Sequence, residues 1–508
     1  IELPKEHIVQ FHKRLKLKRR PYEATPLTDS LTESTLAKVA VELHRFPELK
    51  IEAELVRRYH HAELMAHVLG YVGRINEKEL KEIDETNYLG TNYIGKTGIE
   101  KYYENILHGK VGFEKVETNA RGRILKTIER TEASPGADIQ LFLDLHTQEV
   151  AQEALGNFRG SIVAISPKTG GVIAAVSMPS FDANLFVKGI DSKTYLALNQ
   201  NIDRPLFNRI INGQYPPGST IKPFMGLAGL HHQLTTWERK ISDPGFFSLE
   251  GDGHRYRDWK KGGHGWVDLE VAIIQSCDVY FYDLANKLKI DRMADFLKPF
   301  RFGTLTHVDL PNESSGLYPS REWKKRVKKQ PWFPGETVIT GIGQGYVLTT
   351  PMQMAVATAM LANKGHTVIP RFVHKINGIE PIAREVQPQI TLHYSPDWDR
   401  MIQAMTGVIH TQRGTASRLA KEARYLIAGK TGTAQVFGIK QGEKYNEALL
   451  DKRLHDHAWF MAFAPAQDPE IAIAVIVENG GHGGSVAAPM AKKVMDAYLL
   501  DTLKIKTP

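Results

Sequence analysis

The chain has 508 residues, of which 42% are hydrophobic and 24% charged, a composition typical of globular proteins of two or three domains. Its single cysteine, Cys277, excludes an internal disulfide. No run of about 18 apolar residues is present, so no segment is expected to span a bilayer. Because the chain begins at Ile1 without a methionine or a signal peptide, we expect a piece of a longer protein whose membrane anchor lies upstream.

Part of the net charge of +8 is concentrated in two runs, "HKRLKLKRR" (12–20) and "REWKKRVKK" (321–329). Such runs are usually solvated faces, but they can also contact anionic lipid or an acidic polymer. No nucleic-acid-binding module accompanies this charge, so no nucleic acid is expected as a partner.

The first 135 residues are charged and favour helices. The periodicity predicts amphipathic helices over 31–43 ("LTESTLAKVAVEL") and 76–84 ("NEKELKEID"). The Pro-Gly pair in "RTEASPGAD" (130–138) indicates a domain boundary. We therefore expect an N-terminal domain over residues 1–135 and a second domain over residues 136–508.

The second domain begins with a predicted strand, "DIQLFLDL" (138–145), and a predicted helix, "HTQEVAQEALGNF" (146–158). A hairpin follows, in which "GSIVAIS" and "GVIAAVS" are joined by the turn "PKTG". Near the C-terminus come two more apolar strands, "HAWFMAFAP" and "EIAIAVIVEN", and a closing helix, "APMAKKVMDAYLL". This order predicts an α+β fold: an antiparallel sheet completed by both ends of the domain, flanked by helices, with a large helical insertion between them.

The segment "GQYPPGSTIKPF" (213–224) carries a candidate nucleophile. Its prolines and glycine end an extended stretch and leave Ser219 at a probable helix start. Lys222 follows three residues later on the same helical face, and Ser219 is the only serine of the chain with lysine at that spacing. A lysine can remove the proton of a serine hydroxyl when its surroundings disfavour the charged form. The alternative is a serine at a helix N-terminus beside a solvated lysine.

A serine two residues before an aspartate occurs three times, at Ser180, Ser276 and Ser395. Only Ser276, followed by Asp278, lies beside a strong helical pattern, so we take this pair as the second element of a site. The alternative is a serine that caps a helix.

The triplet Lys-Thr-Gly also occurs three times. The copy at 168–170 is the hairpin turn, and the copy at 96–98 precedes a predicted helix in the N-terminal domain. Lys430, Thr431 and Gly432 follow apolar "YLIAG", as on a strand edge. An edge strand can pair with an extended peptide whose terminal carboxylate meets the lysine and threonine.

Ser-x-x-Lys, Ser-x-(Asn/Asp) and Lys-Thr-Gly, in this order, form the signature of penicillin-binding proteins and serine β-lactamases. The chain resembles the class B, monofunctional penicillin-binding proteins of the cell-elongation machinery in "YPPGSTIKP", "YRDWKKGGHG", "GIGQGYVLTTPMQM", "AGKTGTAQVFG" and "VENGG". Its N-terminal part is similar to their non-catalytic, dimerisation-type pedestal domain in "GKTGIEKYYENILHG" and "NARGR".

This resemblance implies a peptidoglycan D,D-transpeptidase that forms an acyl-enzyme during cell-wall elongation. Ser219 would attack the D-Ala-D-Ala carbonyl with Lys222 as general base, and Ser276 would relay a proton to the leaving group. The N–H groups of Ser219 and Thr433 would form the oxyanion hole. The substrate carboxylate would be held by Lys430, Thr431 and Thr433. The complete set expected at the catalytic site is Ser219, Lys222, Ser276, Asp278, Lys430, Thr431, Gly432 and Thr433.

Two features depart from the family pattern. Asp278 stands where the superfamily usually has asparagine, and a carboxylate cannot donate the hydrogen bonds of an amide. The short N-terminal strand motif of the family and the membrane helix before it are also absent.

The lone thiol, Cys277, lies between the two residues of the second motif. With Asp243, Asp258 and His264 it would offer two carboxylate oxygens, an imidazole and a thiolate, a set that suits a structural, tetrahedral Zn²⁺. Asp252 and His254 are competing ligands of lower rank, because "LEGDGHRY" is typical of a loop tip. The alternative is a buried free cysteine.

The resemblance also implies the partners and the location: peptidoglycan stem peptides, β-lactam antibiotics, a SEDS-type glycosyltransferase and scaffold proteins of the elongation complex. An N-terminal anchor upstream of the given sequence would hold the protein in the bacterial inner membrane as a single-pass protein, with the catalytic domain in the periplasm. Two other functions stay open from the sequence: a hydrolase, meaning a carboxypeptidase or a β-lactamase, and a catalytically silent scaffold.

Overall fold

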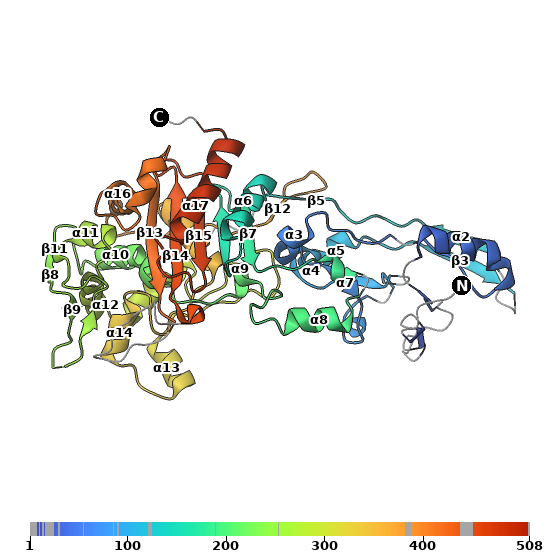
Figure 1. Cartoon of the computed structure of the whole chain (residues 1–508), viewed down its shortest axis with the longest axis horizontal. Coiled ribbons are helices and arrows are strands. Elements are labelled where there is room, and N and C mark those ends of the chain that lie inside the picture. The colour runs from blue at the N-terminus through green and yellow to red at the C-terminus, as the bar shows by residue number, and fades with distance from the viewer. Residues whose placement is uncertain are drawn as a thin grey trace.

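The computed structural model describes residues 8–9, 11–12, 15, 25–28, 31–53, 55–84, 86–88, 91–119, 124–187, 189–251, 253–381, 388–436 and 451–505. The molecule is elongated, with the N-terminal elements at one end and a larger body at the other (Figure 1). Among the described residues, no helix has the length and apolar character needed to cross a membrane. The basic run 12–20 lies almost entirely outside them.

The larger body is built on a five-stranded antiparallel sheet with the strand order β13-β14-β15-β6-β7. Its strands are β6 (Gly160–Ile165), β7 (Val172–Met178), β13 (Ala428–Ala434), β14 (His457–Ala464) and β15 (Ile471–Val477). The first two come from the start of the domain and the other three from its end. The predicted α+β fold, with a sheet completed by both ends, is therefore confirmed.

Helices cover both faces of this sheet. On one face, α6 (Leu145–Leu155) packs against β7 and against α17 (Ala487–Asp496), which itself packs on β14 and β15. On the other face, α15 (Pro351–Ala362) packs on β15, β6 and β14. Because both faces are covered, β15 and all of β14 after His457 are buried and consist of continuous apolar runs.

The insertion between β7 and β13 is mostly helical, as predicted. Its main helices are α10 (Lys222–His231), α11 (Leu269–Ile274), α12 (Asp278–Leu297), α14 (Pro334–Thr340) and α16 (Asp397–His410). Helix α10 packs on α12 and α16, and α16 packs on β13, so the insertion lies against one edge of the sheet (Figure 1). The smaller elements of this domain are α7 (Asn184–Val187), α8 (Ser192–Asn199), α9 (Arg209–Asn212), β8 (Ile241–Asp243), β9 (Phe246–Phe247), β10 (Tyr256–Arg257), β11 (Gly265–Val267), α13 (Arg321–Lys328), β12 (Val373–Ile376) and the π-helical turn η8 (Ala497–Thr502).

The N-terminal domain consists of short helices and hairpins: α2 (Glu33–Glu42), α3 (Ala62–Leu69), β1 (Val72–Arg74), β2 (Tyr93–Gly95), α4 (Gly98–Tyr102), α5 (Glu104–Leu107), β3 (Phe113–Thr118) and β4 (Ile124–Thr131). The chain then enters the larger body through β5 (Ile139–Leu141), which pairs with β12. A hydrogen bond of 2.9 Å from the Tyr103 hydroxyl to the buried Asp309 carboxylate joins the two parts.

Of the two helices predicted in the N-terminal domain, the first is confirmed as α2. The second, over 76–84, is wrong, because only the 3₁₀ turn Glu79–Lys81 forms there. Asn76 does cap this turn, because its side chain accepts the N–H groups of Lys78 and Glu79. No residue of 76–84 is buried, however, so no tertiary packing stabilises a longer helix. The Glu79 carboxylate is in turn bound by Lys96.

Candidate active site

The predicted nucleophile lies in a tight turn. The 3₁₀ turn Gly218–Ile221 runs directly into α10, so Ser219 does stand at a helix start. In a 3₁₀ turn, side chains three residues apart lie one above the other, which places Ser219 and Lys222 on one face. Ser219 is partly exposed, whereas Lys222 is completely buried.

This turn lies against β13 through backbone contacts. A Cβ atom on Gly218 would lie 2.4 Å from the Thr433 carbonyl oxygen, and one on Gly432 would lie 2.8 Å from the Thr220 methyl carbon. Gly218 also has a φ of 54°, and its N–H donates to the Gly343 carbonyl at 2.9 Å. Side chains at these positions would separate the nucleophile from the strand that carries the third motif.

The Lys222 ammonium reaches the second motif. Its Nζ lies 2.6 Å from Asp278 Oδ1, 2.7 Å from the Ser276 carbonyl and 3.3 Å from Ser276 Oγ. Because α10 and α12 pack together, these contacts form between residues that are 54 or 56 positions apart in the sequence. The structure thus brings the first two motifs into direct contact.

Ser276 lies in a sharp turn between α11 and α12. Its φ is 58°, so it stands in a left-handed turn just before the helix that begins at Asp278. The cap of α12 is instead Cys277, whose sulfur accepts the Tyr280 N–H at 3.5 Å. The turn still directs the two side chains apart, with Ser276 Oγ facing the lysines and Cys277 Sγ facing Asp243.

Lys430 completes the cluster from the edge strand β13. Its Nζ lies 2.8 Å from Ser276 Oγ and 3.0 Å from the Thr431 carbonyl, and the side chain is completely buried. Burial, together with the charge of Lys222, lowers the pKa of Lys430 well below its ordinary value. The Ser276 hydroxyl therefore lies between the buried amines of Lys222 and Lys430, and the Lys430 amine loses its proton readily.

The aspartate at the asparagine position fits its surroundings. Asp278 Oδ1 accepts from Lys222, and Oδ2 accepts the backbone N–H of Trp259 at 3.0 Å. Both neighbours are donors, so a carboxylate satisfies both, whereas an amide could accept through one oxygen only. The departure from the family pattern thus adds a buried ion pair between the first two motifs.

The structure separates the site copies of the short motifs from the others. Lys168 pairs with Asp468 and Glu470 beside the hairpin turn, and Lys96 pairs with Glu79. The Ser180 hydroxyl donates to the Glu63 carbonyl. In the third serine–aspartate pair, Ser395 and Asp397, the Asp397 carboxylate accepts the indole N–H of Trp237. None of these residues lies within hydrogen-bonding distance of the Lys222 cluster.

Thr431 and Thr433 lie on the same edge strand as Lys430. The Thr431 hydroxyl is 2.7 Å from that of Thr415, and the Thr433 carbonyl accepts the Gln344 side-chain N–H at 3.0 Å. Sequence reasoning did not assign Thr415 or Gln344 to the site, although Gln344 lies in a segment that carried the resemblance. It also missed Trp259, which acts on Asp278 through its backbone, an interaction that residue type does not reveal.

A second buried network, centred on Glu478, holds the residues that lead into the turn of Ser219. Glu478, just after β15, accepts from Arg209 Nε at 2.8 Å and from the Tyr215 hydroxyl at 2.7 Å. Tyr215 stacks edge-on against Trp459, whose indole N–H donates to the Pro216 carbonyl at 3.1 Å. Although burial raises the pKa of Glu478, the hydrogen bond and charge of Arg209 lower it overall.

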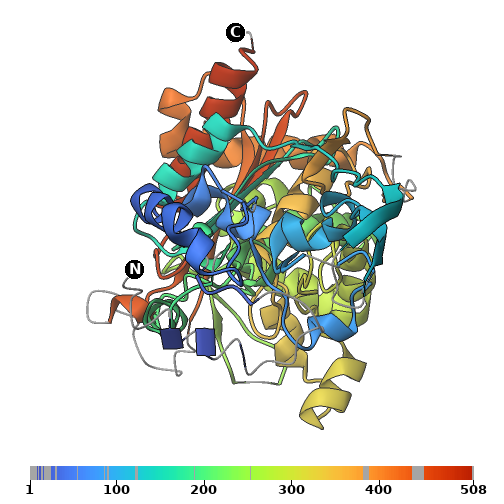
Figure 2. The ribbon, with the colours of Figure 1, turned by 90° about the vertical axis from the view of Figure 1, so that its right-hand side faces the viewer.

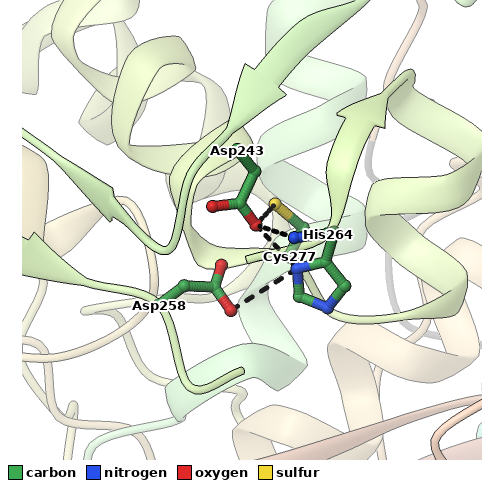
Figure 3. Close-up of side chains that lie close together, drawn as sticks. All are labelled: Asp243, Asp258, His264 and Cys277. Atoms are coloured by element: carbon green, nitrogen blue, oxygen red, sulfur yellow. Dashed lines mark hydrogen bonds and ion pairs between the residues drawn. The ribbon is translucent and has the colours of Figure 1, made fainter. Parts of the chain in front are cut away.

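The four residues predicted to bind a metal do come together (Figure 3). Asp243, Asp258, His264 and Cys277 place one ligand atom each within 4.8 Å of one another. Asp243 Oδ2 lies 2.7 Å from His264 Nδ1 and 3.4 Å from Cys277 Sγ, and His264 Nδ1 lies 3.5 Å from Asp258 Oδ1. Of the competing ligands, His254 lies outside this cluster, and Asp252 lies outside the described residues.

These side chains fit a bound cation. The side chains of Asp243, Asp258 and His264 are fully buried, and His264 Nε2 has no hydrogen-bond partner among the described residues. Burial and the nearby Asp258 raise the pKa of the Cys277 thiol, so a thiolate would need a positive charge beside it. Two buried carboxylates, an imidazole and a thiol form a donor set that Zn²⁺ prefers.

Two family profiles match the chain along most of its length. The Penicillin binding protein transpeptidase domain matches residues 160–496, which include every residue of the Lys222 cluster. The Penicillin-binding Protein dimerisation domain matches residues 3–141. The chain belongs to the penicillin-binding protein family. The resemblance inferred from the three motifs is confirmed.

Individual relatives agree with this assignment. Peptidoglycan D,D-transpeptidase MrdA of Acinetobacter baumannii is 49% identical over 507 residues, which cover 99% of this chain and 75% of that protein. Pseudomonas aeruginosa PBP2, solved in complex with WCK 5153, matches with a TM-score of 0.82 and 49% identity, over 90% of this chain and 93% of that chain. Helicobacter pylori PBP2, solved in complex with MreC, matches with a TM-score of 0.86 and 32% identity, over 98% of this chain and 89% of that chain.

The contact between Gly218 and β13 gives a testable prediction. Gly218→Ala should slow acylation by a fluorescent penicillin about 100-fold, because the clash with the Thr433 carbonyl displaces the nucleophile by a sizeable fraction of an ångström. Gly189→Ala is the matched control, since Gly189 also has a positive φ, 92°, but has no atom within 4 Å of its added Cβ. Equal rates for the two variants would contradict this account.

The Glu478 network gives a second prediction, on stability. Glu478→Gln should lower the free energy of unfolding at pH 7 by about 3 kcal/mol, because it leaves Arg209 buried without a counter-charge. The lowered pKa of Glu478 means that its stabilisation is complete above the unfolded value of about 4.3 and is lost as the pH falls through the folded value. The difference from wild type should therefore shrink in acid.

Denaturant unfolding at pH 7 and in acid measures this effect. Glu470→Gln is the control, because Glu470 lies at the other end of β15 and its partner, Lys168, is largely exposed. An equal loss for both glutamates, or a Glu478→Gln deficit that does not change with pH, would contradict the prediction.

Proposed function

We propose that the chain cross-links peptidoglycan stem peptides as a serine-type D,D-transpeptidase, with Ser219 as the nucleophile. The observation that carries this function is the buried cluster of Lys222, Ser276 and Lys430 beside a partly exposed serine. A general base, a hydroxyl relay and a carboxylate-binding strand edge are the parts that acyl transfer to a peptide requires. The activity of the relatives supports the same reaction.

Acylation begins at the Ser219 hydroxyl. Lys222 can act as the base only when its amine is neutral, so the reactive state is the one in which the Lys222–Asp278 pair has released a proton. The neutral Lys222 then accepts the proton of Ser219 while Ser219 Oγ bonds to the carbonyl carbon of the D-Ala-D-Ala peptide bond. Ser276, 3.3 Å from Lys222 Nζ, then gives a proton to the departing D-Ala amine and recovers one from Lys222. The amine of a second stem peptide attacks the resulting ester, its proton returns by the same route to Ser219, and a new peptide bond forms.

The edge strand positions the substrate. The N–H groups of Ser219 and Thr433 would stabilise the negative charge on the carbonyl oxygen, since the turn and strand that carry them are in backbone contact. The Thr431 and Thr433 hydroxyls, with Lys430, would hold the terminal carboxylate. A β-lactam carries an acyl group and a carboxylate in similar positions, so it would acylate Ser219 and remain attached.

We also propose a structural Zn²⁺ held by Asp243, Asp258, His264 and Cys277. With four protein ligands the ion has no open position, so its contribution is stability rather than chemistry. Cys277 lies between Ser276 and Asp278, so this site would fix the turn that presents Ser276 to the lysines.

The partners and location are proposals that follow from the relatives. The solved complex of Helicobacter pylori PBP2 with MreC supports a protein partner of this kind. We propose that scaffold proteins of the elongation complex contact the N-terminal pedestal, residues 1–135. We extend this to a SEDS-type glycosyltransferase, and to an inner-membrane anchor that leaves the catalytic domain, residues 136–508, in the periplasm.

Fluorescent-penicillin labelling tests the function. Wild-type protein should form a stable covalent adduct, Ser219→Ala should form none, and Lys222→Ala should label at least about 100-fold more slowly because the general base is lost. Rapid turnover of the adduct would indicate a hydrolase instead. Absence of any wild-type labelling would indicate a catalytically silent scaffold.

Elemental analysis tests the metal site. Protein purified without added metal should contain about one zinc per chain, and less than about 0.2 would contradict a tight structural site. Cys277→Ser and His264→Ala should lower both the zinc content and the unfolding temperature, since each removes a ligand. His254→Ala, on the neighbouring loop but outside the cluster, is the control that should retain the metal.

A further inference from the structure

Helix α13 (Arg321–Lys328) projects from the transpeptidase domain beside α14, in both views of the molecule (Figures 1 and 2). Together with the next residue, Lys329, it contains six lysines and arginines and one glutamate. The sequence alone left its role open between a solvated face and a contact with an anionic partner. The catalytic mechanism does not use it.

One side of α13 is fixed to the domain. Lys324 is completely buried, forms an ion pair with Glu336 of α14, and lies 4.2 Å from the centre of the Phe333 ring. Trp323 contacts Tyr346 with 5.2 Å between ring centres, and Lys328 lies over the same tyrosine at 5.9 Å. The helix is thus held in a defined orientation by its inner side chains.

The outer side of α13 carries positive charge without compensation. Lys325, Arg326 and Lys329 are exposed, and within the described parts of the chain no carboxylate lies within 4 Å of them. Arg321, which pairs with Asp291 at the surface, precedes Lys325 by four residues on the same helical face. Like charges at this spacing repel and destabilise a helix, and a bound anion would relieve that repulsion.

The fixed side of α13 is connected to the turn of Ser219 through the segment that contains Tyr346. Tyr346 follows Gln344 by two residues, and the Gln344 side chain donates to the Thr433 carbonyl at 3.0 Å. The adjacent Gly343 carbonyl accepts the Gly218 N–H at 2.9 Å. The basic helix is therefore attached to the segment, residues 343–346, that contacts both the nucleophile turn and β13.

We infer that the outer face of α13, formed by Lys325, Arg326 and Lys329, binds the free carboxylates of un-cross-linked peptidoglycan strands as they approach Ser219. This inference rests on the proposed function, since it names a docking surface for the polymer that the same site cross-links. The charges are complementary: each un-cross-linked stem peptide ends in a carboxylate and so presents a repeated negative charge along the strand. Exposed cations that meet such a polymer raise its local concentration near the cleft.

The attachment of α13 to the segment that contacts the nucleophile turn favours the substrate polymer over a lipid surface as the occupant. Tyr346, which contacts α13, lies in the same segment as Gly343 and Gln344, which bond to the turn of Ser219 and to β13, so the basic face and Ser219 belong to one connected part of the domain. Anionic lipid shares the negative charge but not this route, so it serves as a competing outcome of the test.

The test compares two triple variants of the whole chain that lose the same charge. Lys325→Gln/Arg326→Gln/Lys329→Gln removes the outer cations of α13, and Lys110→Gln/Lys115→Gln/Lys126→Gln removes three exposed cations of the N-terminal domain. Both are compared with wild type after their unfolding temperatures are shown to match. Binding of soluble, un-cross-linked peptidoglycan strands is measured by fluorescence anisotropy at about 50 mM and about 300 mM salt.

We expect the α13 variant to bind the strands about tenfold more weakly at low salt, since each exposed charge pair contributes a factor of a few, and to lose most of the salt dependence. The N-terminal control should bind as wild type does. Strands whose carboxylates have been amidated should bind wild type as weakly as native strands bind the α13 variant.

Three outcomes would overturn the inference: equal binding by the two variants, tight binding of amidated strands, or a loss of binding by the α13 variant to phosphatidylglycerol vesicles but not to strands. The last would assign α13 to a lipid surface. Penicillin labelling of Ser219 in the wild-type chain is independent of these readouts. A chain that labels normally but binds strands without regard to α13 refutes this inference and leaves the proposed function intact.

Discussion

The buried ion pair between Lys222 and Asp278 is the interaction on which the rest of the site depends. A lysine buried without a counter-charge costs several kcal/mol, so α10 and α12 must stay packed with this pair intact. Asp278 uses its second oxygen to hold the Trp259 N–H, and its own N–H donates to Asp258 at 2.7 Å. Lys222, the second motif and the proposed metal site therefore form one continuous set of contacts.

A second constraint is the close backbone approach at the edge of the sheet. The interior strands are covered on both faces and paired on both sides, so only an edge strand such as β13 can present its backbone to a substrate. Gly218 and Gly432 let the nucleophile turn lie directly on that strand. The Glu478 network holds the approach to the turn from the other side through Tyr215 and Trp459. Catalytic geometry is thus fixed by rigid elements rather than by a mobile loop.

The sequence predictions were correct where the local pattern of residues was strong. Long apolar runs were correctly taken as buried strands, and the helix of residues 31–43 formed because its periodicity and its Thr32 cap agree. The helix over 76–84 did not form, although Asn76 caps its first turn, because none of its residues is buried against the rest of the protein. The left-handed turn at Ser276 was not predicted, because the residue type does not indicate it. Trp259 and Gln344 were missed because their bonds involve backbone atoms, which the residue types do not indicate. The Trp259 backbone N–H donates to Asp278, and the Gln344 side chain donates to the Thr433 carbonyl.

The sequence by itself determined the family, the α+β layout and the order of three motifs, because these depend on residue spacing and apolar periodicity. It also named the four side chains of the proposed metal site from their ligand chemistry. It also selected the Lys-Thr-Gly at 430–432 over the other two copies, from the apolar strand before it and the family resemblance. The tertiary structure added that Lys430 is buried against Ser276, whereas Lys96 and Lys168 pair with glutamates elsewhere. It also decided that Asp278 serves as an ion-pair partner for Lys222, because that role depends on two helices packing side by side, 56 residues apart along the chain.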